Sequence, residues 1–406
     1  MCLIIITSTY PYGKKETYFE NELPYLAAKF DRVFIFPIYN PTGSLERREV
    51  PANVAVLSPI LKQGVRRFLE GLLQMTINTH YRKDFFKEKV YRSPFKLKMW
   101  VNSLFLYNNG VLRINNLLKS QRLTNSDTII YAYWARAPFF LSRRLHKLKK
   151  VLRMHGGDFY IERNRGYLPA QKYIYDSSEV LLPISKDIAE RLEKLYQQPK
   201  EKIRVSYLGV GNAEVTCAWA PFTENLNKIR FVSCSNIIPL KRIHLIYEIL
   251  RNIRGIDVEW FHIGDGPTKE ALIAKFHQEE CSNLKWNFVG QLNQNDLRAF
   301  YRENYFDWFI NVSGYEGLPV SIMEAFSFGI PVIATDVGGT SEIVNNKNGI
   351  LVQKDFDAKV VASLILSSRK KKPYLRKRVC AFETWYDFFN AERNYSLLAS
   401  YLKCKI

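Results

Sequence analysis

Two glutamates near the end of the chain have the surroundings of a ligand-binding site. Glu316 lies between Gly314 and Gly317, where glycine lets the backbone approach a ligand closely. Glu324 follows in an apolar stretch that predicts a helix with Pro319 as its first residue. A carboxylate on so apolar a helix is costly unless a partner hydrogen-bonds it. That partner is either a pair of sugar hydroxyls or a neighbouring lysine or arginine.

The start of the same helix predicts a site for an anion. The N–H groups of Val320 and Ser321 would have no partner inside the helix, and they lie at the positive end of the helix dipole. We expect the helix to run to about Phe328, with Gly329 as its C-terminal cap. A short β-branched strand over 332–335 and a glycine turn then follow.

The whole segment from Gly314 to Gly339, GYEGLPVSIMEAFSFGIPVIATDVGG, resembles the signature of the retaining glycosyltransferases of family GT4, which have the GT-B fold. Many such enzymes work in bacterial polysaccharide biosynthesis. The resemblance implies that Glu316 contacts the donor sugar and that Glu324 holds the ribose of the nucleotide. It also implies that the donor site includes Gly317, Leu318 and Val320.

The resemblance implies an α/β protein of two Rossmann-like, doubly wound domains that face each other across a cleft. The alternation of short apolar strands with helices agrees with this fold class. We expect an acceptor-binding domain over 1–207, a hinge and linker over 208–228, and a nucleotide-sugar-binding domain over 229–380. Helices over 381–406 should cross back to the first domain.

A second motif should hold the donor diphosphate. Lys241 matches the lysine with which family members bind this group, in a loop that follows the predicted strand 229–234. Asn236 stands where the family usually has arginine, and Arg242 where it has glycine. An amide hydrogen-bonds phosphate but cannot neutralise it, so the clamp is weaker or is completed by Arg242. Three further donor-site residues implied by the resemblance are Gly264, Gly266 and Val289.

The first domain carries two candidate segments. His155 begins a His-Gly-Gly turn at the end of a strand; a lone histidine is more often structural, but this one matches the family histidine that faces the donor sugar. Asp158 could help to recognise donor or acceptor. The loop after the first strand resembles one that contacts both substrates, or it is an ordinary strand–helix turn. Its candidate residues are Gly13, Lys14, Lys15 and Glu16.

Composition bears on the number of cores and on the cellular compartment of the protein. The 406 residues are 47% apolar, enough for two cores, and no apolar run approaches the ~18–20 residues of a membrane-spanning helix. The six cysteines are scattered, without a Cys-x-x-Cys pair. This pattern favours a reduced, cytosolic compartment and no zinc site.

Most of the net charge of +20 falls in one region. Residues 51–150 hold 19 lysines and arginines against 4 acidic residues. Such a region favours an anionic partner: a membrane surface, a nucleic acid or a phosphorylated substrate. Over 60–120, basic and apolar residues alternate at helical spacings, which is typical of an amphipathic helix at a membrane surface or of a solvated helical face. We expect an anionic membrane rather than nucleic acid, since no nucleic-acid-binding module is recognisable.

The reaction implied by the resemblance is sugar transfer with retention. The donor would be a UDP- or GDP-sugar, the acceptor a lipid-linked oligosaccharide, and the enzyme peripheral to the inner face of the plasma membrane. Glu316, His155 and Lys241 would be catalytic, with no metal and no cofactor, and the leaving phosphate would take the acceptor proton. Two alternatives stay open: an epimerase or phosphorylase of the same fold, and a non-enzymatic anion-binding protein.

Overall fold

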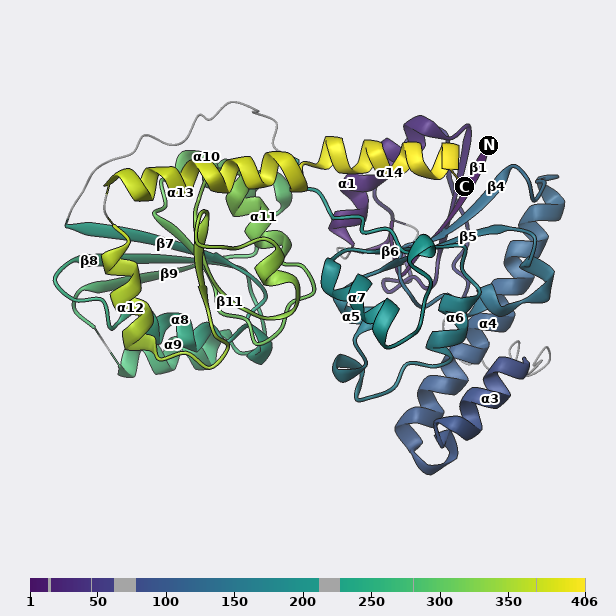
Figure 1. Ribbon diagram of the computed structural model, residues 1–406, viewed down its shortest axis with the longest axis horizontal. Helices are drawn as coiled ribbons and strands as arrows, with labels where there is room; N and C mark the ends of the chain where they lie inside the picture. The colour runs from purple at the N-terminus through teal and green to yellow at the C-terminus, as the bar shows by residue number, and fades with distance from the viewer. Residues whose placement is uncertain are drawn as a thin grey trace. The chain divides into compact units, whose positions relative to one another are not determined.

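The chain folds into two compact units (Figure 1). The first comprises Met1–Leu208 with Ala391–Ile406, and the second comprises Gly209–Asn390. The sequence placed the whole of 381–406 with the first domain, whereas the structure assigns only the part from Ala391 onward to it. The computed structural model describes residues 1–13, 16–44, 46–61, 78–211, 227–279, 281–369 and 371–405.

The first unit is built on a parallel sheet of six strands in the order β3-β2-β1-β4-β5-β6. All six residues of β1 are buried, as expected for a strand covered on both faces. The loops after β1, β4 and β5 leave the same edge of the sheet, because these strands are parallel neighbours. The strands are β1 (Cys2–Thr7), β2 (Arg32–Pro37), β3 (Val54–Val56), β4 (Thr128–Ala132), β5 (Lys149–Met154) and β6 (Val180–Pro183).

The C-terminal helix completes the core of the first unit. Leu398 and Leu402 of α14 lie in one buried cluster with Phe19 and Leu23 of α1. The last residues of the chain therefore fold with its first strand. The α-helices of this unit are α1 (Thr17–Lys29), α3 (Thr79–Lys87), α4 (Pro94–Ser120), α5 (Gly156–Phe159), α6 (Gln171–Asp176), α7 (Lys186–Lys194) and α14 (Ala391–Lys405).

Two segments of this unit are irregular. After β4, the chain forms two 3-10 helices, Pro138–Leu141 and Arg143–Leu145. They are separate because the Ser142 hydroxyl accepts a bond from a backbone N–H two residues on, which starts a new turn. Residues 202–207 form only an isolated bridge beside β6, between Ile203 and Leu181.

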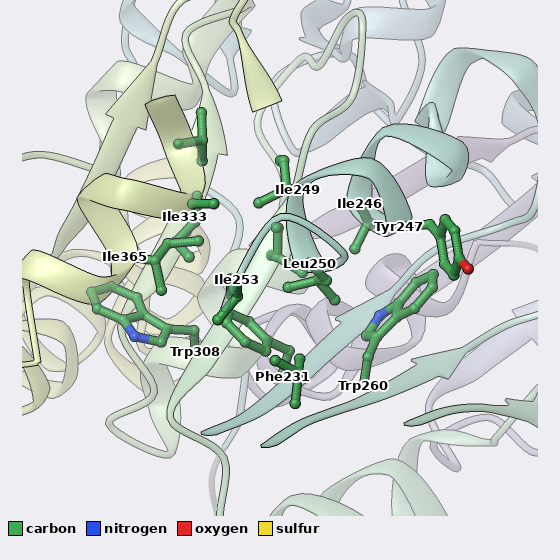
Figure 2. Packing of buried hydrophobic residues seen from close by; sticks show 14 of the residues in the cluster. Phe231, Ile246, Tyr247, Ile249, Leu250, Ile253, Trp260, Trp308, Ile333 and Ile365 are labelled. Atoms are coloured by element: carbon green, nitrogen blue, oxygen red, sulfur yellow. The ribbon is translucent and has the colours of Figure 1, made fainter. Parts of the chain in front are cut away.

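The second unit has a sheet of the same design, also parallel, in the order β12-β11-β10-β7-β8-β9. Phe231 of β7, Trp308 of β10 and Ile333 of β11 pack together with α8 on one face (Figure 2). The strands are β7 (Lys228–Cys234), β8 (Asp257–Ile263), β9 (Leu284–Gly290), β10 (Trp308–Asn311), β11 (Val332–Thr335) and β12 (Gly349–Val352).

The helices of the second unit flank this sheet. The basic run 369–372 leads into one of them, which begins at Lys371. The α-helices are α8 (Ile243–Leu250), α9 (Lys269–Gln278), α10 (Gln294–Glu303), α11 (Val320–Ser327), α12 (Ala358–Ser367) and α13 (Lys371–Thr384), which continues as the π-helix Trp385–Phe389. Within the described ranges, no helix combines the length and apolar character needed to cross a bilayer.

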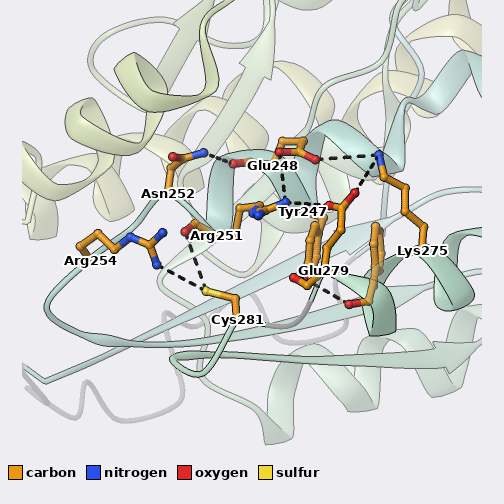
Figure 3. Close-up of polar contacts among 9 residues, drawn as sticks. Tyr247, Glu248, Arg251, Asn252, Arg254, Lys275, Glu279 and Cys281 are labelled. Carbon is orange, nitrogen blue, oxygen red and sulfur yellow. Dashed lines mark hydrogen bonds and ion pairs between the residues drawn. The ribbon is translucent and has the colours of Figure 1, made fainter.

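A polar network joins the ends of α8 and α9 (Figure 3). The Tyr247 ring stacks on Phe276 at 4.1 Å, and its hydroxyl donates to the carbonyl of Glu279 at 2.5 Å. Arg251 pairs with the Glu279 carboxylate at 2.7 Å. Because this ion pair is partly exposed, the stacked rings contribute more to stability than the charges do. The network fixes the helix that leads into β9.

Candidate functional site

Two loops pack backbone to backbone where β7 and β8 end. Gly264 has a φ of +139°, and a Cβ there would lie 2.0 Å from the Ser235 carbonyl oxygen. A Cβ at Gly266 would lie 2.3 Å from the carbonyl oxygen of Ile237. The Ile237 N–H donates to the Asp265 carbonyl at 2.9 Å. Only glycine fits at both positions, so the glycine turn shapes the loop after β7.

A buried histidine, not identified from the sequence, supports this loop. His262 Nδ1 lies 2.8 Å from the Ser233 hydroxyl, which also accepts a bond from Trp260 Nε1 at 2.9 Å. The other ring nitrogen lies 3.2 Å from the Ser235 carbonyl, to which it donates. Burial lowers the pKa of His262 to about 4, so the ring is neutral near pH 7. The chain of bonds steadies the backbone that presents the exposed Asn236 side chain.

Lys241 and Glu316, which are 75 residues apart, form an ion pair at this edge of the second sheet. Lys241 ends the 3-10 helix Pro239–Lys241, and its Nζ lies 2.6 Å from Glu316 Oε1. Asn311 Nδ2 donates to the same oxygen at 3.3 Å. The Lys241 and Glu316 side chains are only 22% and 13% exposed. A cation and a carboxylate are thus held together beside the end of β10.

The turn after β11 holds the backbone of this carboxylate in place. Gly338 has a φ of +54°, and a Cβ there would lie 1.8 Å from the Glu316 carbonyl oxygen. The Gly339 N–H donates to the Gly317 carbonyl at 3.0 Å. The sequence indicated only a turn at these two glycines. The structure shows that Gly338 is required by the close approach to Glu316.

Arg242 is directed towards backbone carbonyls. It precedes α8 with a φ of +50°, and its Nε donates to the Val312 carbonyl at 2.7 Å. Its Nη1 donates to the Lys354 carbonyl at 3.0 Å, while the buried Nη2 has no hydrogen-bond partner. Arg242 therefore joins the ends of β10 and β12. Its guanidinium group is therefore engaged mainly with the protein backbone.

The helix predicted over the signature segment is present as α11. Pro319 is its N-cap rather than its first residue, and no side chain caps the helix. The N–H groups of Val320 and Ser321 therefore have no capping side-chain acceptor, which leaves them for an anion. Gly329 follows the helix end with a φ of +60°, as expected for a C-terminal cap.

Glu324 is buried on α11 and interacts with two side chains of α10. Gln294 Nε2 donates to Glu324 Oε1 at 3.1 Å. Burial raises the pKa of Glu324 to about 7, an effect opposed by the Gln294 hydrogen bond and the nearby charge of Arg298. No lysine or arginine of the described residues forms an ion pair with Glu324 within 4.0 Å. The alternative of a simple salt bridge is thus not what the structure shows.

In the first unit, the Glu16 carboxylate is held by the loop after β1. Its Oε2 accepts from the Thr9 and Tyr10 N–H groups at 2.6 and 2.7 Å, and its Oε1 accepts from Trp134 Nε1 at 2.5 Å. Glu16 therefore shapes the loop from within. Gly13 has a φ of +68°, as a tight turn requires, whereas Lys14 and Lys15 lie outside the described residues.

His155 follows β5 and is buried between aromatic rings. Its ring centroid lies 4.5 Å from that of Trp134 and 4.7 Å from that of Tyr133. Its Nε2 lies 3.0 Å from the Tyr133 carbonyl, to which it donates. Burial, together with the charge of Arg153, holds the pKa of His155 well below its usual range. The imidazole is neutral, so it can hydrogen-bond a ligand but does not carry a proton to it as an imidazolium.

Asp158 ties two loops of the first sheet together. Its Oδ1 accepts from the His155 N–H at 2.7 Å, and its Oδ2 accepts from the Ala135 N–H at 2.5 Å. Burial raises the pKa of Asp158 to about 7. Its carboxylate is used to join the loops after β4 and β5, so Asp158 positions His155 and is not directed at a substrate.

A buried ion pair, not anticipated from the sequence, lies just before His155. Arg153 Nη1 lies 2.9 Å from Glu22 Oε2, and both side chains are fully buried. The Tyr131 hydroxyl donates to the other oxygen of Glu22 at 2.7 Å. Arg153 Nη2 donates to the Ser206 carbonyl at 3.1 Å. A lone arginine inside an apolar strand was the only sequence signal for this arrangement.

Among the described residues, no group of three or more His, Cys, Asp or Glu side chains could hold a metal ion. The sequence does contain an Asp-x-Asp triplet at 355–357. Asp357 is the N-cap of α12 and accepts from the Lys359 N–H at 2.7 Å, so this carboxylate has a structural partner.

The expected site residues thus form one group in each unit. Lys241, Glu316 and the start of α11 meet at the edge of the second sheet, with Glu324 in the same helix. His155, Asp158 and Glu16 meet at the edge of the first sheet. Val289 is half-buried on β9.

Part of the chain matches a known protein family. Residues 220–379 match the family described as Glycosyl transferases group 1. Over 203 residues, the chain is 28% identical to the putative colanic acid biosynthesis glycosyltransferase WcaL of Escherichia coli strain K12. The aligned region covers 48% of this chain and 49% of the relative. The chain thus spans about half the length of the curated relatives it matches.

Solved structures extend the likeness over nearly the whole chain. A glycosyltransferase from Rickettsia africae ESF-5 superimposes with a TM-score of 0.68 at 16% identity, covering 99% of this chain and 97% of that one. Anabaena Alr3699/HepE in complex with UDP gives a TM-score of 0.67 at 16% identity, covering 99% of both chains. These matches confirm the α/β, GT-B fold class expected from the sequence.

Proposed function

We propose that the protein is a retaining glycosyltransferase that uses a nucleotide-sugar donor, since residues 220–379 match the family described as Glycosyl transferases group 1. One observation carries the proposal. The Lys241–Glu316 ion pair lies beside the uncapped start of α11, and the buried Glu324 lies within the same helix. A cation, a helix N-terminus and two carboxylates are the groups that a sugar diphosphate and a ribose require.

Each of these groups has a distinct proposed role. Lys241 and the N–H groups at the start of α11 stabilise the charge that develops on the leaving diphosphate. The Glu324 carboxylate accepts hydrogen bonds from the ribose hydroxyls, for which its pKa of about 7 leaves it partly ionised near neutral pH. Glu316 accepts from hydroxyls of the sugar. Arg242 supports the loop through its bonds to the Val312 and Lys354 carbonyls.

The reaction proposed from these roles is a displacement on one face of the sugar. The bond between the anomeric carbon and the phosphate oxygen breaks, and the bond to the acceptor oxygen forms on the same side. The leaving phosphate oxygen takes the acceptor proton, because the lowered pKa of His155 makes its imidazole a weak base. His155 contributes a hydrogen bond to the donor sugar, and Asp158 positions it. Lys241 and α11 supply the positive charge, so we propose that no metal is needed.

The donor, acceptor and cellular place follow from the relatives and from charge. Alr3699/HepE was crystallised with UDP, so a UDP-sugar is the first donor to test, with a GDP-sugar as the second. The likeness to a colanic acid enzyme supports a polysaccharide pathway and a lipid-linked oligosaccharide acceptor. The basic region 51–150 supports an anionic membrane as the surface where transfer takes place, on its cytoplasmic side.

A ligand-induced stability shift tests the proposal. The wild-type protein and Glu324→Ala are melted with UDP, GDP, ADP, CMP and their sugars, and the exposed Glu270→Ala on α9 serves as the matched control. A ligand at 100 times its Kd adds about 2.7 kcal/mol to the free energy of unfolding. We expect one nucleotide to stabilise the wild type and Glu270→Ala but not Glu324→Ala. If none does so, with or without a divalent metal, the protein is not a nucleotide-sugar enzyme.

The anomeric configuration of the product then tests the stereochemistry. The stabilising nucleotide sugar is incubated with the protein and an oligosaccharide acceptor, and the product is examined by NMR. Retention supports the proposed displacement. Inversion would overturn it. Cleavage of the oligosaccharide by inorganic phosphate, with formation of a sugar phosphate, would instead indicate a phosphorylase.

A further inference from the structure

A helical hairpin of the first unit carries an unusual surface. It consists of α3, the 3-10 helix Val90–Arg92 and the long α4, and it extends away from the sheet (Figure 1). Its outer end, called here the hairpin tip, comprises residues 82–98. The hairpin is held against the rest of the unit: the buried Asp84 accepts from the Tyr167 hydroxyl at 2.5 Å and from the Ala170 N–H at 3.1 Å.

The hairpin tip exposes aromatic side chains on an ordered base. Phe86 is 70% exposed and Tyr91 is 52% exposed. Both rings nevertheless lie beside Phe85, with ring centroids 5.5 and 5.9 Å from its own. Phe85 in turn packs edge-on against the buried Trp100 at 5.1 Å. Leu97 of α4 is also exposed, at 41%. The tip therefore presents a small apolar patch whose underlying rings are fixed by the core of the hairpin.

Most of the exposed charges of the hairpin tip are positive. The exposed charged residues of the hairpin tip are Arg82, Lys83, Lys87, Lys89, Arg92 and Lys98. The acidic residues of the tip are otherwise engaged: Asp84 is buried, and the half-buried Glu88 lies 3.8 Å from Lys96. The tip thus combines exposed aromatic rings with six exposed cations and one partly exposed carboxylate, that of Glu88.

We propose that the hairpin tip docks the protein on an anionic lipid bilayer, with Phe86 and Tyr91 entering the headgroup region. Aromatic rings favour the boundary between headgroups and acyl chains, where an apolar ring and a polar edge are both accommodated. Each lysine or arginine near an anionic leaflet strengthens binding about fivefold, and the long side chains reach the phosphates while their stems stay in apolar contact. A projecting tip suits a flat surface, whereas single-stranded nucleic acid is bound in a groove.

This inference names the residues for the membrane partner of the proposed function, but it does not require sugar transfer. Vesicle co-sedimentation tests it, with vesicles of neutral phosphatidylcholine alone and with about one-third phosphatidylglycerol. We expect binding to the anionic vesicles only, weakened at least tenfold by raising the salt from about 0.1 to 0.5 M. We expect Phe86→Ser/Tyr91→Ser to weaken binding about tenfold and Lys87→Glu/Lys89→Glu to weaken it at least 20-fold.

Matched variants in the second unit test whether any change of surface charge, or the loss of any exposed aromatic ring, weakens vesicle binding. Lys347→Glu/Lys359→Glu carries the same charge change on exposed residues of the second unit, and Phe388→Ser removes a ring that is 54% exposed. Both should bind vesicles as the wild type does, and so should Glu324→Ala if it loses nucleotide binding. Circular dichroism confirms that each variant is folded.

Three outcomes would overturn the inference. Equal binding to neutral vesicles would show that charge plays no part. Equal weakening by the second-unit charge change would show a general effect of net charge. Binding of an oligonucleotide that is unaffected by Phe86→Ser/Tyr91→Ser, with no binding to vesicles, would indicate a nucleic-acid surface instead.

Discussion

The ammonium group of Lys241 lies 2.6 Å from the carboxylate of Glu316, so the two residues proposed to bind opposite parts of the donor are paired with each other. Both are largely buried, and Asn311 adds a hydrogen bond to the same carboxylate oxygen. A diphosphate that binds Lys241 must therefore compete with Glu316 for it. The pairing lowers the net positive charge that the site offers to an anion.

This competition predicts opposite effects of two substitutions on nucleotide binding. Glu316→Gln frees Lys241 and removes a like charge, so we expect it to bind UDP about 5-fold more tightly, since about 1 kcal/mol corresponds to this factor. Lys241→Met should weaken UDP binding at least about 10-fold. Sugar transfer by Glu316→Gln should nevertheless fall by about 100-fold. Calorimetric titration checks the affinities, and weaker UDP binding by Glu316→Gln would contradict the competition.

Glu324 should make stability depend on pH. Burial raises its pKa from 4.5 to about 7, so the folded protein keeps a proton that the unfolded chain releases within this range. The wild type should therefore lose stability relative to Glu324→Gln as the pH rises from 4.5 to 7, by about 3 kcal/mol in total. Urea denaturation at pH 4.5, 6 and 8 measures the difference. A difference that is constant with pH would show that Glu324 is not held in this environment, and Glu270→Gln should show no such trend.

Gly338 should tolerate no side chain. A Cβ there would lie 1.8 Å from the Glu316 carbonyl oxygen, and the φ of +54° adds strain. We expect Gly338→Ala to cost at least about 2 kcal/mol of unfolding free energy and to lose UDP binding, because the Glu316 backbone must move. Gly255→Ala is the matched control, since its φ of +80° brings similar strain but no atom lies within 4 Å of its Cβ. It should cost about 1 kcal/mol and keep UDP binding. Equal losses in the two variants would mean that backbone strain alone is responsible.

The buried pair of Arg153 and Glu22 should depend strongly on both partners. Arg153→Met or Glu22→Leu alone leaves an unpaired buried charge, so we expect each to cost about 3–5 kcal/mol. The double variant leaves neither charge and should recover most of this loss. Urea denaturation of the four proteins forms a double-mutant cycle. Additive losses would show that the two side chains do not act as a pair.

The local structure of the signature segment was predictable from the sequence. The helix over 320–327, its glycine cap and the strand over 332–335 all depend on neighbours within a few residues, such as apolar spacing, proline and glycine. The parallel sheets were predictable for the same reason, because continuous apolar runs alternate with helices. Periodicity does not reveal where a serine hydroxyl begins a new turn, as Ser142 does between the two 3-10 helices.

The partners of the charged side chains were decided only by the tertiary structure. Local periodicity gives no sign that Lys241 would meet Glu316, that Arg242 would turn to carbonyl groups, or that the Glu16 carboxylate would be used by its own loop. These contacts join segments from the ends of different strands, and a side chain's direction depends on which ends the sheet order brings together. The sequence by itself therefore determined the elements and the types of residue at their ends, because both follow from nearby chemistry. The tertiary structure determined which of those residues remain available to a ligand, because long-range packing chooses the partner of each buried charge.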